Sequence, residues 1–133
     1  MGKLLFSKLK DKLNIFNQNN IVYSIPCSLC DRVYVGQTSQ QLKRRISQHK
    51  SDIIHINKKC ALAEHCRRDV HIMNFDSVKI LEIENNYRKR SFLEMYHINQ
   101  NPKSMNYRTD IQNLNQIYSY LFTFNDKYKN IVP

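Results

Sequence analysis

Short runs of β-branched and aromatic residues mark two segments near the start of the chain, at residues 21–26 and 32–36. Such residues favour strands, and the segment between the runs contains two cysteines and begins at a proline. The pattern predicts an antiparallel hairpin with an elaborated turn. In such a hairpin Tyr23 and Tyr34 approach each other.

Helical periodicity follows the hairpin. Thr38 and Gln41 form a capping-box pattern, and apolar residues then recur at helical spacing, which predicts a helix over residues 38–54. Gly36, the only glycine after Gly2, lies between the second strand and this helix. Its position indicates either a positive φ or a close approach that leaves no room for a side chain.

The rest of the chain contains four more predicted elements. They are a short helix over residues 61–68, a strand over 78–83, a helix over 88–99 that ends before Pro102, and a helix over 111–124 followed by a polar tail. We therefore expect an α+β fold in which a small three-stranded antiparallel sheet is flanked by helices.

The chain has 133 residues, the usual length of one domain. We expect the domain to span residues 21–108. Residues 1–20 are basic and carry apolar residues at helical spacing, which predicts an amphipathic helix or linker that packs on the core or binds a membrane or partner. Residues 109–133 form the C-terminal helix and tail.

Positive charge dominates the composition, with 21 Lys and Arg against 11 Asp and Glu, a net charge of +10. The surplus gathers over residues 32–68, and a surplus of this size favours nucleic acid or another polyanion. A solvated helix surface or an acidic protein partner would explain the same charge. We expect DNA contacts, weakened by salt, from the basic residues of the two central helices: Lys43, Arg44, Lys50, Arg67 and Arg68.

No apolar stretch approaches the roughly 20 residues of a membrane-spanning helix, so we expect no membrane association of that kind. The opening residues lack the features of a secretory signal. We therefore expect an intracellular protein whose four cysteines are reduced thiols or metal ligands instead of disulfides.

Residues far apart in the chain follow the order of a nuclease superfamily. The tripeptides Ile21-Val22-Tyr23 and Tyr34-Val35-Gly36 are followed by Arg45, His49, Glu94 and Asn106. This pattern resembles the GIY-YIG superfamily over about residues 21–107, and it is most similar to the endonuclease domain of Penelope-like retroelements. The first tripeptide departs from the family, because Ile21 stands where Gly is usual.

The resemblance implies catalytic roles for three of these side chains on the hairpin and the first helix. Tyr23 would be the general base or its hydrogen-bonding neighbour, and Tyr34 would orient water or phosphate. Arg45 would hold two phosphate oxygens, because a guanidinium is always charged and forks two hydrogen bonds.

The remaining three residues complete the implied site. His49, one helical turn after Arg45, would shuttle a proton or hold phosphate. Glu94 would bind one Mg²⁺ or Mn²⁺ together with water and substrate oxygens. Asn106 would support the site through hydrogen bonds.

The resemblance also points to a structural zinc site. Penelope-like domains have a cysteine pair in the hairpin turn and two later histidines, which here match Cys27, Cys30, His65 and His71. Two thiolates and two imidazoles form a tetrahedral Zn²⁺ site. Cys60 and Cys66 are competing ligands, and free cysteines with unrelated histidines are the alternative to any metal site.

Together these features predict a metal-dependent DNA endonuclease that nicks one strand, of retroelement origin, located in the nucleus and fused to or associated with a reverse transcriptase. The first alternative is a catalytically inactive, zinc-containing nucleic-acid-binding module. The second is an interaction module that uses residues 1–20, with its charge serving only solubility.

Overall fold

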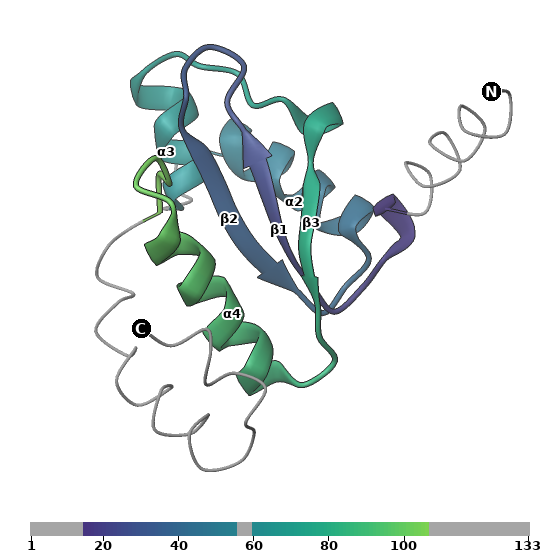
Figure 1. Cartoon of the computed structure of the whole chain (residues 1–133). Helices are drawn as coiled ribbons and strands as arrows, with labels where there is room; N and C mark the ends of the chain where they lie inside the picture. Colours follow the sequence, from purple (N-terminus) through teal and green to yellow (C-terminus); the bar gives the residue numbers. More distant parts are fainter. Residues whose placement is uncertain (1–14, 56–59, 107–133) are drawn as a thin grey trace, which may run out of the picture.

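The computed structural model describes residues 15–55 and 60–106, and the fold is the expected three-layer α+β arrangement (Figure 1). The antiparallel sheet has the strand order β2-β1-β3. Its strands are β1 (Ile21–Pro26), β2 (Val33–Thr38) and β3 (Lys79–Ile83). Helices α2 (Leu42–Ile54) and α3 (Ala61–Arg68) cover one face, α4 (Tyr87–Gln100) covers the other, and a short turn of 3-10 helix, η1 (Phe75–Ser77), precedes β3.

The central strand β1 divides two hydrophobic cores between its faces. Side chains alternate along a strand, so every second residue points to the same layer. Ile21, Tyr23 and Ile25 belong to the larger core with residues of α2 and α3. Val22 belongs to the smaller core with Phe92 and other residues of α4. All of β1 is therefore fixed by packing on both sides.

The outer edge of β2 is covered by the chain that follows α4. Val33 donates its amide to the Lys103 carbonyl at 3.1 Å and accepts a hydrogen bond from the Met105 amide at 2.8 Å. A free strand edge would leave such groups unpaired. This cover also brings Asn106 beside β2.

The prediction that a helix begins at residue 38 is wrong. Thr38 is the last residue of β2 and pairs with Ile21 across the sheet, so its backbone is held in the strand. Its hydroxyl accepts a hydrogen bond from the Gln40 amide at 3.0 Å. Helix α2 begins at Leu42, and its N-cap residue Gln41 makes no side-chain capping bond.

The other predicted elements that fall on described residues agree with the structure to within one or two residues. Most of the segment expected over residues 1–20 lies outside the described residues, although 15–17 are helical. The helix expected over 111–124 lies wholly outside them. Within the described ranges, every helix is too short or too polar to cross a membrane.

Gly36 marks the tightest point of the hairpin. It lies in β2 directly opposite Tyr23 of β1, and its φ is not positive. A Cβ atom at this position would lie 2.6 Å from Tyr23 Oη and 2.8 Å from Tyr34 Cε2. Of the two explanations for this glycine, the structure therefore supports the close approach.

We expect Gly36→Ala to destabilise the fold by about 1–3 kcal/mol, the usual effect of forcing a methyl group into a filled space. The Tyr23 ring cannot easily move away, because it is fully buried. Denaturant unfolding followed by circular dichroism measures the change. An unaltered free energy of unfolding would show that the two tyrosine rings are free to shift.

Candidate active site and metal centre

Three aromatic side chains meet on the face of the sheet covered by α2. The hydroxyl of Tyr23 lies 2.7 Å from His49 Nε2, and both side chains are completely buried. The Tyr34 ring lies edge-on to the His49 ring, with centroids 5.1 Å apart, and 6.4 Å from the Tyr23 ring. The structure thus brings together the two tyrosines and the histidine predicted from the sequence.

Burial determines the protonation of this group. Burial raises the pKa of Tyr23 far above its ordinary value and raises the pKa of Tyr34 to about 12. It lowers the pKa of His49 to about 3, with a further contribution from the Arg45 charge. At neutral pH the group therefore consists of two protonated phenols and a neutral imidazole.

His49 depends on Tyr23 for its hydrogen bonding. Its other ring nitrogen, Nδ1, is buried and has no hydrogen-bond partner in the part of the chain that the structure describes. The sequence allowed His49 to hold a phosphate, but its complete burial against two tyrosines leaves no surface for that contact. The observed geometry instead makes His49 the partner that orients the Tyr23 hydroxyl.

Arg45 lies one turn before His49 on α2 and adds a positive charge beside the phenols. Burial alone would lower the pKa of Arg45, but its interactions with Tyr23 and Tyr34 outweigh that effect and the net shift is upward. In return, its charge and hydrogen bonding partly offset the rise in the pKa of both tyrosines. Gln48 fixes the guanidinium, whose Nη1 donates to Gln48 Oε1 at 2.9 Å.

Glu94 and Asn106 approach the group from later parts of the chain. Glu94, on α4, is close enough for its charge to contribute to the raised pKa of both phenols. Asn106 holds β2 beside Tyr34, since its side chain donates to the Val35 carbonyl at 2.7 Å and accepts from the Val35 amide at 3.0 Å. These bonds are of the supporting kind expected for Asn106.

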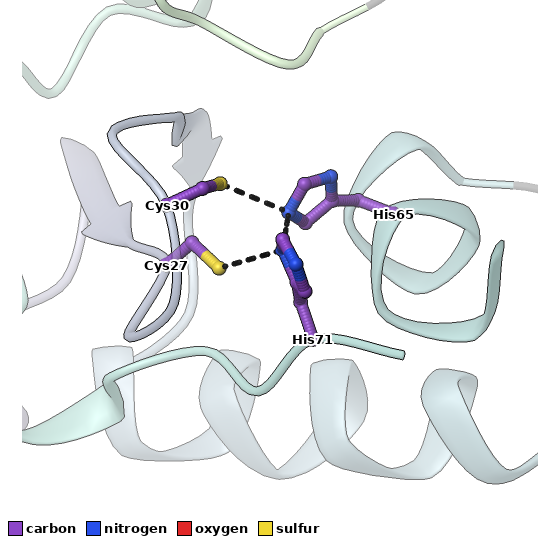
Figure 2. Close-up of side chains that lie close together, drawn as sticks. All are labelled: Cys27, Cys30, His65 and His71. Atoms are coloured by element: carbon purple, nitrogen blue, oxygen red, sulfur yellow. Dashed lines mark hydrogen bonds between the residues drawn. The ribbon is translucent and has the colours of Figure 1, made fainter. Parts of the chain in front are cut away.

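A second cluster lies at the far end of the hairpin, where Cys27, Cys30, His65 and His71 converge (Figure 2). One atom of each side chain lies within 4.8 Å of the others. Cys27 Sγ is 3.4 Å from His71 Nδ1, Cys30 Sγ is 3.5 Å from His65 Nε2, and the two nitrogens are 3.2 Å apart.

These separations match those around a tetrahedral zinc ion. Zinc bonds of about 2.3 Å to sulfur and 2.0–2.1 Å to nitrogen place sulfur and nitrogen about 3.5 Å apart and two nitrogens about 3.3 Å apart. The donor set, two thiols and two imidazoles, is one that Zn²⁺ prefers. The cluster therefore fits a zinc ion in both geometry and chemistry.

Backbone pairing holds the two halves of the cluster together. Cys27 forms an isolated bridge with Met73, and the Ser28 amide donates to the Ile72 carbonyl at 2.8 Å. The segment that carries His71 is thus tied to the cysteine turn by backbone hydrogen bonds.

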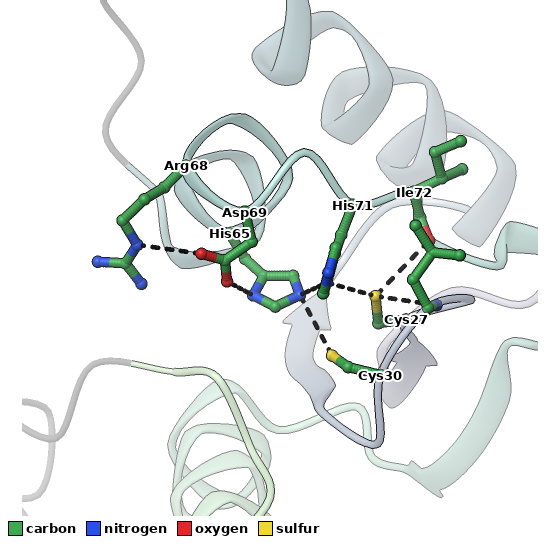
Figure 3. Close-up of polar contacts among 8 residues, drawn as sticks. Cys27, Cys30, His65, Arg68, Asp69, His71 and Ile72 are labelled. Atoms are coloured by element: carbon green, nitrogen blue, oxygen red, sulfur yellow. Dashed lines mark hydrogen bonds and ion pairs between the residues drawn. The ribbon is translucent and has the colours of Figure 1, made fainter.

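Asp69 orients one of the histidines (Figure 3). His65 Nδ1 lies 3.1 Å from Asp69 Oδ2, one helical turn away. A carboxylate at this distance accepts a hydrogen bond from Nδ1–H, which leaves the lone pair of Nε2 directed at the cluster. Asp69 is not among the residues predicted from the sequence, although its four-residue spacing from His65 on a helix indicates such a contact.

The other two cysteines lie outside the cluster. Cys60 is the N-cap of α3, where its sulfur accepts a hydrogen bond from the Ala63 amide. Cys66 is buried in the larger core, and burial raises the pKa of its thiol. The competition considered for these two cysteines is therefore not seen.

The basic residues expected to contact DNA differ in their surroundings. Lys43 and Arg44 are exposed near the start of α2. Lys50 lies 5.3 Å from the centre of the Phe75 ring. Arg67 donates to the His55 carbonyl at 2.7 Å, and Arg68 pairs with Asp69 at 3.6 Å. The last two are thus partly engaged in holding α3.

Comparison with known families identifies the fold. The model of the GIY-YIG catalytic domain matches residues 19–108, which is more than half of the chain. The protein therefore belongs to the GIY-YIG family, as its two tripeptides indicated. The same comparisons found no match among curated proteins or among solved structures.

A strained residue lies between the two histidines of the cluster. Val70 has a φ of 55° and follows the end of α3. There the His71 amide donates a hydrogen bond to the Cys66 carbonyl at 3.1 Å. This is the Schellman arrangement that usually employs glycine. The left-handed conformation is unfavourable for a β-branched side chain, so the fold accepts strain here in order to bring His71 back beside His65.

We expect Val70→Gly to stabilise the metal-free protein by about 1 kcal/mol, because glycine removes the left-handed strain but loses more entropy on folding. Ile72→Gly is the matched control, since Ile72 is also exposed and β-branched but has an ordinary negative φ. It should lower stability. Thermal unfolding of both variants in a chelator measures the effect, and equal destabilisation by the two substitutions would contradict the strain.

Proposed function

We propose that this protein is a metal-dependent DNA endonuclease that cuts one strand by hydrolysing a phosphodiester bond. The observation that carries the proposal is the meeting of Tyr23, Tyr34, Arg45 and His49 in one group, to which the charge of Glu94 also extends. If these side chains lay far apart, the sequence resemblance would be the only support for a nuclease. Membership of the GIY-YIG family supports the same reaction class.

In this proposal Tyr34, which is only partly buried, orients the attacking water or the phosphate. Tyr23 is fully buried and acts behind it as a hydrogen-bonding neighbour. The protonated Tyr23 hydroxyl can donate to the neutral His49 imidazole. His49 acts through Tyr23, because its buried ring orients the hydroxyl.

Arg45 stabilises the charge that develops on the phosphate. A guanidinium in a half-buried site interacts more strongly with an anion than it would in open water. Its hydrogen bond to Gln48 limits the number of orientations that it can adopt. Lysine at this position would keep the charge but lose the fork.

Glu94 is the proposed ligand of Mg²⁺ or Mn²⁺. When bound, the metal would supply Lewis acidity and an acidified water. Within the described residues Glu94 belongs to no group of three or more potential metal ligands. Carboxylate oxygens suit these ions, but a single carboxylate is enough only if water and substrate provide the other ligands. We therefore propose that the metal and DNA bind to the protein together.

The cysteine and histidine cluster is proposed to hold a structural zinc ion. Zinc would fasten the hairpin turn to the segment after α3, in a domain whose core is small. The pair of cysteines in the turn and the two later histidines also support the proposed kinship with Penelope-like retroelement endonucleases. That kinship would make the nick a primer end for an associated reverse transcriptase and would place the protein in the nucleus, which imaging of the tagged protein tests.

We expect the purified protein to bind one zinc ion per chain, with affinity reduced at least tenfold by Cys27→Ser or Cys30→Ser because each removes a thiolate ligand. Cys60→Ser is the control, since serine can replace the cysteine as a helix cap and the residue lies outside the cluster. Elemental analysis and competition with a chelator measure the change. Retention of stoichiometric zinc by the Cys27→Ser, Cys30→Ser double variant would exclude these ligands.

We expect the protein to nick supercoiled plasmid in Mg²⁺ or Mn²⁺, and Glu94→Gln to reduce the rate by at least about 100-fold through loss of the metal ligand. Glu64→Gln, the same change on α3, should leave the rate unaltered. Gel electrophoresis of the plasmid measures both. Undiminished nicking by Glu94→Gln would refute the metal role, and DNA binding without nicking by the native protein would favour the inactive zinc-containing module.

A further inference from the structure

An open hollow lies beside the tyrosine group, and apart from Arg45 and its partner Gln48 the residues that line it have no role in the reaction proposed above. It has a volume of about 250 Å³ and lies where the end of β2, the start of α2 and the start of α4 meet. Arg45 lines it on one side and Arg90 on another. Arg90 was not among the functional residues predicted from the sequence, although it stands one helical turn before Glu94.

Arg90 is a buried cation whose hydrogen-bond partners are all neutral. Only 3% of the residue is exposed. Its Nε donates to the side-chain oxygen of Gln37 at 2.8 Å, and its Nη1 donates to the Asn20 side chain at 3.3 Å and to the backbone carbonyls of Glu84 and Asn85 at 2.9 and 3.4 Å. No carboxylate among the described residues forms an ion pair with it.

The cost of burying this charge is therefore only partly offset. A charged group removed from water is usually paired with an opposite charge, and neutral acceptors compensate for less of the lost hydration. All four hydrogen bonds use Nε and Nη1, so the second amino group of the fork, Nη2, makes none with the described residues. The Arg90 guanidinium is therefore fixed in position, and its Nη2 group can donate to another acceptor.

The remaining lining of the hollow favours an anion. Thr38 and Ser39 supply hydroxyl groups, the other residues contribute amide or phenol groups, and none of the described residues that line it is acidic. Guanidinium groups and hydroxyl groups are both donors that recognise phosphate oxygens. Water alone could fill the space, but it would not neutralise the two guanidinium groups, neither of which forms an ion pair with a carboxylate of the described residues.

We propose that this hollow binds a backbone phosphate of DNA next to the phosphate that is cut. The inference rests on the proposed nuclease function, because Arg45 lines the hollow and also belongs to the tyrosine group. A neighbouring phosphate held by Arg90 would fix the direction and register of the strand across Tyr23 and Tyr34. Arg90 thus positions the substrate and takes no part in bond cleavage, which is left to Arg45 and the tyrosine group.

Ser39→Asp tests the proposal by placing a negative charge in the hollow. Ser39 is exposed and makes no hydrogen bond in the fold that the substitution would break. Ser77→Asp is the control, because it makes the same change at an exposed residue that does not line the hollow. Thermal unfolding of both variants should match that of the native protein.

The first measurement is a titration with inorganic phosphate followed by the NMR signal of the Arg90 Nε–H group. We expect a saturable shift, with affinity reduced about fourfold by Ser39→Asp, as for a unit charge about 5 Å from the anion in water. Ser77→Asp should leave the affinity unaltered. Absence of a saturable shift in the native protein, or equal affinities in the two variants, would overturn the proposal.

The second measurement separates DNA from free phosphate as the occupant. The affinity for a short DNA duplex is measured over a range of salt concentrations. Ser39→Asp should lower this affinity, and the slope of its logarithm against the logarithm of salt concentration should fall by the equivalent of about one phosphate contact. Phosphate binding with unchanged DNA binding would make the hollow a free-phosphate site and refute its role toward DNA. If Ser39→Asp weakens DNA binding but the native protein nicks no plasmid, the nuclease proposal fails and the phosphate site stands.

Discussion

The absence of a side chain at position 36 is the constraint on which the rest of the structure depends. Tyr23 lies opposite Gly36 in the sheet, and its ring occupies the space that a Cβ atom would need. Only with that space free can the phenol lie against β2, meet the Tyr34 ring and reach His49 on α2. The glycine thus acts through the position of its neighbours, and no unusual backbone conformation is involved.

The same face of β1 serves the core, the tyrosine group and the metal cluster. Ile21, Tyr23 and Ile25 of β1 and Cys27, which directly follows the strand, occupy alternate positions, and all four are buried in the larger core. Because side chains alternate strictly along a strand, a shift of one residue in the pairing would remove all of them from that face. The hairpin register therefore couples the proposed zinc site to the proposed active site. A metal that fixes the turn would also restrict the strand that carries Tyr23.

The sequence was sufficient for features that depend on local pattern and pairing. Alternation and turn residues predicted the hairpin and hence the approach of Tyr23 to Tyr34. The four members of the metal cluster were predicted from the family resemblance, which matched the cysteine pair in the turn to two later histidines. The helix start predicted from the capping-box pattern at Thr38 is wrong because Thr38 pairs with Ile21 of β1, and this pairing keeps its backbone in the strand. Local pattern cannot show such a competition.

The features that could not be predicted are those that depend on several distant segments at once. The neutral state of His49 follows from burial under two tyrosines, and the environment of Arg90 comes from β2, from Asn20 and from the carbonyls before α4. An arginine in a helix is ordinarily exposed, so nothing in its own neighbourhood marks it. Arg45 and Arg90 are both held in place by neutral side chains, while the phenols and imidazole beside Arg45 carry no charge at neutral pH. Neither cation forms an ion pair with a carboxylate of the described residues, although the charge of Asp52 contributes to the raised pKa of Arg45. Two fixed cations of this kind are stabilised when an anion such as a DNA backbone arrives.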